Sequence, residues 1–143
     1  MERRAVVLTL GGSDPLMLSW PLAMELRQRL TEDVDLHVVM GGAAPHHQNV
    51  KDLATQMRGI SVYVDPPVVA DIFARAGLAV TAGGGTAGEL MAMGIPVMCV
   101  LVADNQQAAA QHNLFPVLDG RVLTPNLIAD RVSILWCDRN WLK

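Results

Sequence analysis

The residues best suited by type and spacing to bind a ligand are three consecutive glycines, Gly83–Gly85, followed by Thr86. An apolar run typical of a buried strand, residues 78–81, precedes them, and the pattern after them predicts a helix over residues 86–93. Glycines let a ligand approach backbone N–H groups closely, and a helix N-terminus carries about half a positive charge. We therefore expect this turn to bind a phosphate group.

The same glycines also match the dinucleotide-binding pattern GxGxxG, through Gly83, Gly85 and Gly88. That pattern belongs in the first strand–helix turn of its fold, and an acidic residue follows about 20 positions later, at the end of the next strand. Here the motif lies past the middle of the chain, and the residues after Asp104 look like another helix start. The sequence disfavours dinucleotide binding but leaves phosphate binding as the expected chemistry.

The elements that must position this turn are apolar runs that alternate with helical patterns. Predicted strands cover residues 5–10, 34–40, 60–64, 78–81 and 97–102, with a short strand near residues 116–118. Predicted helices cover residues 20–30, 49–57, 68–76, 86–93 and 105–113, and a last helix begins at Thr124-Pro125 and ends near residue 135. Ser19, Asn49 and Asp104 are the expected N-caps of three of these helices.

Alternating strands and helices with short connections predict one α/β domain over residues 1–143, with a doubly wound, mostly parallel sheet of about six strands and a Rossmann-like form. The turns after its strands are residues 11–14, 41–42, 65–67, 83–86 and 104–106. Ligands of such sheets bind at the carboxyl ends of the strands. Because all these glycine or polar turns fall at that edge, we expect them to form one binding site.

Composition excludes several other classes of function. The net charge is −3 and no dense basic run is present, which argues against a nucleic-acid partner. No apolar run reaches the length of a membrane span, and Cys99 and Cys137 lack metal-ligand spacing, so we expect a cytoplasmic protein with reduced thiols. The adjacent His46 and His47 have no evident third ligand, and neither a metal nor another cofactor is expected.

Three segments of the sequence carry a resemblance to a known family. They are Gly11-Gly12-Ser13-Asp14-Pro15, then Gly83-Gly84-Gly85-Thr86-x-x-Glu89 with Gly94-Ile-Pro96, then Ala103-Asp104-Asn105-Gln106. Together they resemble the C-terminal half of the UDP-sugar hydrolases of pseudaminic acid biosynthesis, which are related to the UDP-N-acetylglucosamine transferase of peptidoglycan synthesis. Both families have the two-domain GT-B architecture. One departure is Gly85, where the family pattern has serine, so a hydroxyl is lost from the phosphate turn.

The resemblance implies a role for each matching residue. Gly84, Gly85 and Thr86 would hold the pyrophosphate of a UDP-sugar, with Gly12 and Ser13 approaching it from the first turn. Glu89 would accept hydrogen bonds from the ribose, and Asp104, Asn105 and Gln106 would lie toward the sugar. The base would rest near Tyr63, Val64 and Asp65, read largely by backbone atoms.

The resemblance also implies what the partners and the activity are. The family's catalytic histidine belongs to an N-terminal domain, and no histidine of this sequence matches its motif, so the catalytic residues are unknown and expected in an N-terminal half that this chain lacks. The implied partner is that N-terminal GT-B domain or a partner subunit, and the implied reaction releases UDP and a free diacetamido-trideoxy sugar. The alternatives are a nucleotide-sugar glycosyltransferase and a non-catalytic binding subunit of a split GT-B enzyme.

Two motifs of the expected site also have a purely structural interpretation. Thr86 and Glu89 have the spacing of a capping box, in which the carboxylate turns back onto the helix N-terminus and is then not available to a ribose. Asp104 and Gln107 have the same spacing, and Ser13 could serve as a cap. The sequence leaves these alternatives open.

Overall fold

The computed structural model describes residues 4–10, 16–44, 47–82, 85–102 and 117–137 of the chain. Its strands are β1 (Ala5–Thr9), β2 (Asp35–Met40), β3 (Ile60–Val64), β4 (Ala76–Ala82), β5 (Val97–Leu101) and β6 (Val117–Asp119). Its helices are α1 (Ser19–Arg29), α2 (His47–Gln56), α3 (Val69–Phe73), α4 (Gly85–Ala92) and α6 (Pro125–Cys137).

The six strands form one sheet in the order β3-β2-β1-β4-β5-β6, and every neighbouring pair is parallel. β1 lies in the middle, with Val7 opposite His37 of β2 and opposite Ala79 of β4. This order confirms the expected doubly wound, Rossmann-like α/β fold. The chain runs outward in one direction from β1 to β3 and in the other from β4 to β6, so the strand order reverses between β1 and β4.

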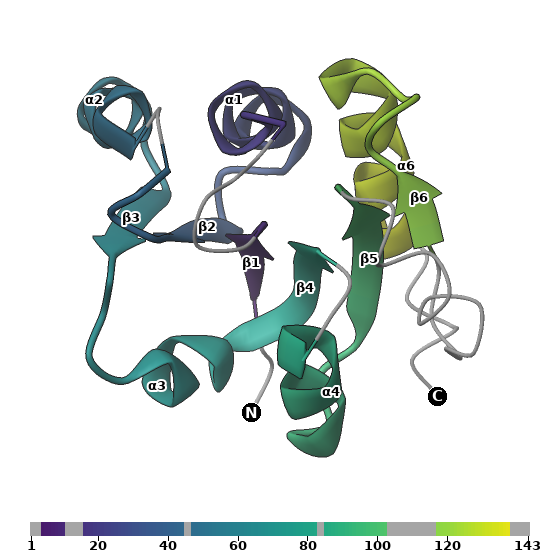
Figure 1. Ribbon diagram of the computed structural model, residues 1–143. Helices are drawn as coiled ribbons and strands as arrows, with labels where there is room; N and C mark the ends of the chain where they lie inside the picture. The colour runs from purple at the N-terminus through teal and green to yellow at the C-terminus, as the bar shows by residue number, and fades with distance from the viewer. Residues whose placement is uncertain (1–3, 11–15, 45–46, 83–84, 103–116, 138–143) are drawn as a thin grey trace.

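Helices cover both faces of the sheet (Figure 1). α1, α2 and α6 lie on one face, where residues such as Leu22, Leu26 and Trp136 pack with the larger buried cluster. α3 and α4 lie on the other face, where Phe73 and Leu90 belong to a second cluster. Burial of apolar side chains on both faces is the main stabilising term of such a sheet.

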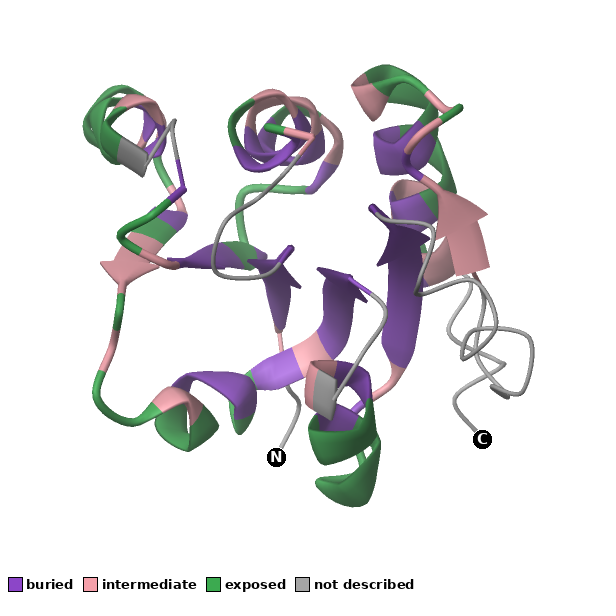
Figure 2. Ribbon diagram, in the orientation of Figure 1, coloured by how far each residue is buried: buried purple, intermediate pink, exposed green. Residues whose placement is uncertain are grey.

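The central strands are apolar without alternation because both of their faces are covered. All residues of β1 and of β5 are buried, whereas the edge strands β3 and β6 are only partly buried (Figure 2). Continuous aliphatic runs are typical of parallel strands inside an α/β domain. The composition, 51% hydrophobic with 4% aromatic, therefore supplies an aliphatic core.

The starts of two helices differ from the sequence prediction. α1 begins at Ser19 and its N-cap is Leu18, which makes no side-chain capping bond, so Ser19 as N-cap is wrong. Both residues are buried, and we attribute this start to burial of Leu18 rather than to a polar cap. α2 begins at His47, so Asn49 lies inside the helix and its assignment as N-cap is also wrong.

The helix expected over residues 68–76 is much shorter in the structure. α3 ends at Phe73, and Ala76 is already the first residue of β4, fully buried and paired with Ala5 of β1. The pairing with β1 overrides the helix-forming tendency of the alanines. The helix expected over residues 105–113 and its N-cap Asp104 lie outside the described residues.

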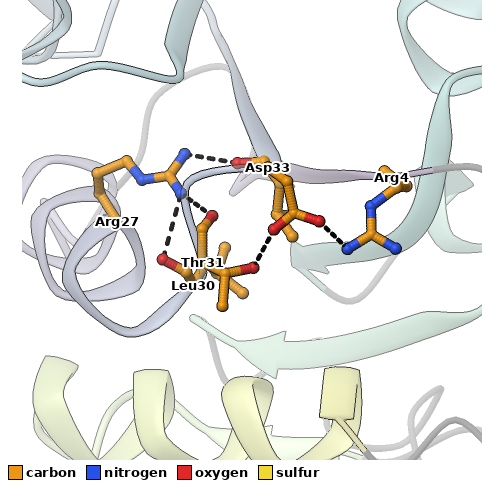
Figure 3. Close-up of polar contacts among 6 residues, drawn as sticks. Arg4, Arg27, Leu30, Thr31 and Asp33 are labelled. Carbon is orange, nitrogen blue, oxygen red and sulfur yellow. Dashed lines mark hydrogen bonds and ion pairs between the residues drawn. The ribbon is translucent and has the colours of Figure 1, made fainter.

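A buried arginine, Arg27, joins three segments at the amino edge of the sheet. Figure 3 shows its bonds to Leu30 and Thr31. Nη1 of Arg27, on α1, donates to the carbonyl oxygens of Val34 at 2.6 Å and Gly59 at 3.1 Å. Nη2 of the same side chain donates to the carbonyl oxygens of Leu30 at 3.3 Å and Thr31 at 2.6 Å. The cation thus satisfies carbonyls at the C-terminus of α1, where the helix dipole favours positive charge, and fixes the starts of β2 and β3. Beside it, Asp33 accepts hydrogen bonds from Arg4 and Thr31.

Candidate functional site

A cleft of about 260 Å³ lies at the carboxyl ends of the strands. It is lined by residues from the ends of β1 and β2, from the turns after β2 and β3, and from the first turns of α3 and α4: Thr9, Val39, Met40, Gly41, Asp65, Pro66, Val69 and Thr86. It therefore lies beside the point where the strand order reverses, which is the position at which open α/β sheets bind ligands. The structure brings together four residues of the turns that the sequence analysis selected: Gly41, Asp65, Pro66 and Thr86.

The part of the cleft near α4 offers hydroxyl groups and a helix N-terminus. Thr9 is about nine-tenths buried and pairs in register with Thr81 of β4, so two threonines stand side by side at the ends of the central strands. Thr86 is the second residue of α4, which begins at Gly85. The first backbone N–H groups of a helix have no partner within the helix, and they attract anions. This part of the cleft is suited to a phosphate.

The part of the cleft near β3 carries a carboxylate that is held in place. Oδ2 of Asp65 accepts a hydrogen bond from the backbone N–H of Gly42 at 2.9 Å. The backbone N–H of Asp65 donates to the carbonyl of Met40, also at 2.9 Å, and the residue has a φ of 48°. A Cβ added to Gly42 would lie 2.6 Å from the same Oδ2, so only glycine allows this approach. Asp65 therefore joins the turn after β3 to the turn after β2.

Tyr63 and Val64, also expected near a base, lie in β3 and are not among the residues that line the cleft. The Tyr63 hydroxyl lies 3.3 Å from Nδ1 of His37, and the two ring centroids are 5.7 Å apart. Burial lowers the pKa of His37, nearby Asp35 opposes that effect, and the charge of Arg75 adds to it. His37 is buried in β2 and is not among the residues that line the cleft.

The structure decides one of the alternatives at α4. The helix begins at Gly85, which places Thr86 inside its first turn, so Thr86 is not the N-cap and the capping-box interpretation with Glu89 is wrong. Glu89 is exposed and lies one turn further along α4, outside the lining of the cleft. The remaining expected site residues, Gly12, Ser13, Gly84, Asp104, Asn105 and Gln106, lie outside the described residues.

The sequence analysis missed several lining residues. Thr9 carries the clearest overlooked signal, because it is the one polar residue of β1 and lies two positions before the pair Gly11-Gly12. Val39, Met40 and Val69 are apolar and gave no signal that distinguishes a cleft wall from the core. The bond between Asp65 and Gly42 joins residues 23 positions apart, and only the pairing of β2 with β3 brings them together.

Within the described ranges, no group of three or more His, Cys, Asp and Glu side chains is placed to hold a metal ion. Cys99 and Cys137 are both free, as expected; burial raises the pKa of the Cys99 thiol to about 11, whereas Cys137 is exposed. Among the helices that the structure describes, none is long and apolar enough to cross a bilayer.

No family model matches the chain. The spore coat polysaccharide biosynthesis protein SpsG of Bacillus subtilis (strain 168) is 28% identical over 109 residues, which are 76% of this chain and 32% of that protein. The chain therefore spans about a third of the length of this relative.

Three solved structures share the fold. The glycosyltransferase VinC in complex with dTDP matches with a TM-score of 0.71 and 18% identity, over 99% of this chain and 35% of VinC. The glycotransferase of kitacinnamycin matches with a TM-score of 0.60 and 15% identity, over 92% of this chain and 35% of its own. The glycosyltransferase GlyE of Streptococcus pneumoniae TIGR4 matches with a TM-score of 0.57 and 13% identity, over 94% of this chain and 33% of GlyE. The chain therefore shares its Rossmann-like fold with about a third of the length of each of these three glycosyltransferases.

Proposed function

We propose that this chain binds a nucleotide-sugar, as the nucleotide-binding half of a GT-B enzyme. The observation that carries the proposal is the cleft at the reversal of the strand order, with threonine hydroxyls and the N-terminus of α4 on one side and a carboxylate on the other. Such a cleft suits a ligand that has a diphosphate at one end and hydrogen-bond donors at the other. The dTDP complex of VinC, which shares the fold, supports the same assignment.

In this proposal the diphosphate of a UDP-sugar lies against Gly84, Gly85 and Thr86. No lysine, arginine or histidine is among the residues that line the described cleft. Stabilisation of the phosphate charge is therefore assigned to backbone N–H groups and the dipole of α4, which act as fixed partial charges. Gly12 and Ser13 complete the phosphate site from the turn after β1.

This placement of the diphosphate also places the nucleoside and the sugar. The nucleoside points toward Tyr63, Val64 and Asp65, and Glu89 accepts from the ribose hydroxyls. The sugar lies toward Asp104, Asn105 and Gln106. The residues that activate the attacking group belong to an N-terminal domain or a partner subunit, so this chain supplies binding and orientation rather than proton transfer.

For the reaction, we propose hydrolysis of the UDP-sugar. Water attacks the anomeric carbon of the sugar, the bond to the diphosphate oxygen breaks, and UDP leaves with the bonding electron pair. The products are UDP and a free diacetamido-trideoxy sugar for pseudaminic acid synthesis. This assignment is supported by the three segments that resemble the hydrolase family, above all Ala103-Asp104-Asn105-Gln106.

A second candidate reaction is transfer of the sugar to an acceptor hydroxyl. The observation in its favour is that all three solved structures named above are glycosyltransferases. The enzyme that contains this domain, incubated with a UDP-sugar in the presence and absence of acceptor, distinguishes the two. Free sugar formed without acceptor supports the hydrolase, and a glycoside formed only with acceptor supports the transferase.

Calorimetric titration with UDP, UMP and NAD tests the binding proposal. We expect UDP to bind at least about tenfold more tightly than UMP, which corresponds to about 1.4 kcal/mol for the second phosphate. Thr86→Val should weaken UDP binding, whereas Thr55→Val, an exposed threonine of α2 outside the cleft, should not. Absence of UDP binding at millimolar concentration, or NAD binding as tight as that of UDP, would overturn the proposal.

A further inference from the structure

We propose that the carboxylate of Asp65 determines nucleoside specificity, by accepting a hydrogen bond from a donor of the nucleoside and by directing the phosphates to the opposite part of the cleft. This inference rests on the proposed function. It assigns to the Asp65 side chain a role that the sequence analysis gave to backbone atoms of the same segment.

The first step of the argument is that this carboxylate is fixed before any ligand arrives. Asp65 has a φ of 48°, in the left-handed region that L-residues other than glycine, asparagine and aspartate seldom adopt. Its backbone N–H is bonded to Met40 and its Oδ2 to the N–H of Gly42, both at 2.9 Å. Asp65 thus has a fixed backbone and a fixed carboxylate oxygen, and it lies in the wall of a cleft.

The second step is that the carboxylate keeps acceptor capacity beyond this bond. An ionised carboxylate has two oxygens and about four acceptor sites. The bond from Gly42 uses one site on Oδ2, and Asp65 is exposed. An ionised carboxylate can accept hydrogen bonds from a ligand but has no proton to donate. It therefore recognises O–H and N–H donors.

The third step is that the cleft has electrostatic polarity. The sheet order places the turn after β3, which holds Asp65, two strands away from β1, whereas α4 follows β4 on the other side of β1. One part of the cleft thus carries a negative charge, and the other carries the positive end of a helix dipole. A nucleoside diphosphate satisfies both only with its phosphates at Thr86 and its nucleoside at Asp65. Phosphate beside Asp65 would be repelled by a like charge.

The donors available on a uridine nucleotide are the ribose hydroxyls and the N3–H of the base. Both are hydrogen-bond donors of the kind that an ionised carboxylate accepts. Bonds to a charged acceptor are among the stronger hydrogen bonds, and removing the donor leaves the carboxylate without a ligand partner. We therefore expect a nucleotide that lacks the relevant donor to bind more weakly than UDP.

The experiment compares the wild-type protein with Asp65→Asn by calorimetric titration. The ligands are UDP, 2′,3′-dideoxyuridine diphosphate, N3-methyluridine diphosphate and inorganic pyrophosphate. Asparagine keeps the size of the side chain, tolerates the left-handed conformation and can still accept from Gly42. Asp71→Asn is the matched control, because Asp71 is an exposed acidic residue of α3 that does not line the cleft.

We expect the wild-type protein to bind one of the two analogues at least about tenfold more weakly than UDP, which is about 1.4 kcal/mol. In Asp65→Asn, UDP should bind more weakly and that discrimination should decrease, while pyrophosphate binds as well as before or more tightly. If the variant no longer discriminates against the dideoxy analogue, the donor is a ribose hydroxyl. If it no longer discriminates against the N3-methyl analogue, the donor is the base. Asp71→Asn should behave as wild type.

Two results would overturn the inference. If Asp65→Asn binds UDP with unchanged discrimination against both analogues, Asp65 only joins two turns, and a lower melting temperature would be its sole effect. If the wild-type protein binds UDP but does not discriminate against either analogue, no nucleoside donor is read at this position. Failure of the wild-type protein to bind UDP at all would instead remove the proposed function itself.

Discussion

Nη1 of Arg27 lies 3.1 Å from the carbonyl oxygen of Gly59, and a Cβ at position 59 would lie 2.3 Å from the same nitrogen. Gly59 also has a φ of 83°, which favours glycine by itself. A buried cation and a glycine that lie 32 positions apart in the sequence are therefore fitted to each other at the amino edge of the sheet. The cleft lies at the opposite, carboxyl edge of the sheet.

Gly59→Ala should lower the free energy of unfolding by about 2 kcal/mol or more, because alanine is strained at this φ and its methyl group displaces the guanidinium. Gly94→Ala is the matched control: its φ is 75°, but a Cβ there would meet no atom within 4 Å. The control should cost about 1 kcal/mol, from backbone strain alone. Urea denaturation measures both, and equal losses would show that contact with Arg27 contributes nothing.

Arg27→Met should be strongly destabilising. The substitution keeps an unbranched side chain but removes the donors to the carbonyls of Val34, Gly59, Leu30 and Thr31. Leaving buried carbonyls without partners should cost about 2–4 kcal/mol in chemical denaturation. Arg29→Met, on the same helix, is the control.

Arg29 pairs with Asp130 at 2.6 Å and with Glu25, and these carboxylates raise its pKa, but the pairs are at the surface. Exposed ion pairs contribute little because water and salt screen them. Arg29→Met should therefore destabilise far less than Arg27→Met. A larger loss in the Arg29 variant would contradict the assignment of Arg27 as the residue that holds this edge together.

His37 should make the stability of the protein depend on pH. Burial holds its pKa below the ordinary value of 6.5, so as the pH falls below that value the unfolded chain takes up a proton before the folded protein does. The contribution to stability is therefore fully present above pH 6.5 and is lost as the pH falls through the folded-state pKa, by at most about 1.4 kcal/mol per pH unit.

His37→Gln removes this titration. The stability of the wild type minus that of the variant should fall between about pH 7.5 and pH 5.5, because groups common to both proteins cancel in the difference. Thermal unfolding across this range, or urea midpoints, gives the comparison. A difference that stays constant or rises toward acid would show that His37 is not held neutral beside Tyr63.

The two cysteines should differ sharply in reactivity. Cys99 is fully buried in β5 with its pKa raised to about 11, so it offers almost no thiolate at neutral pH, whereas Cys137 is exposed in the last turn of α6. A thiol reagent should modify Cys137 in the native protein and Cys99 only after denaturation. Cys137→Ser should abolish the native reaction. Rapid modification of both thiols in the folded protein would contradict the described packing of β5.

Glu89→Ala should separate ribose binding from helix stability. Because α4 begins at Gly85, Glu89 is not a member of a capping box, and we expect the unfolding free energy to change by less than about 0.5 kcal/mol. If Glu89 accepts from the ribose as proposed, UDP affinity should fall about tenfold. Calorimetry and denaturation of the same variant give both values. A loss of stability with unchanged UDP affinity would reverse this assignment.

The sequence by itself determined the fold class, because aliphatic runs such as Val97–Leu101 and helical patterns alternate with short turns, and few architectures bury such runs on both faces. It also placed the start of α4 to within one residue, since a helix was predicted from Thr86 and the observed helix begins at Gly85. β3 was predicted with its observed bounds, Ile60–Val64. Local pattern is sufficient where periodicity and turn chemistry agree.

Only the tertiary structure decided where the helices start and how the cleft is built. Burial of Leu18 and Ser19, and the pairing of Ala76 with Ala5, override local capping and helix signals because tertiary contacts outweigh propensities of a few tenths of a kcal/mol per residue. The bonds from Arg27 to Gly59 and from Gly42 to Asp65 join residues far apart in sequence. Such contacts depend on which strands become neighbours, and no local pattern encodes that.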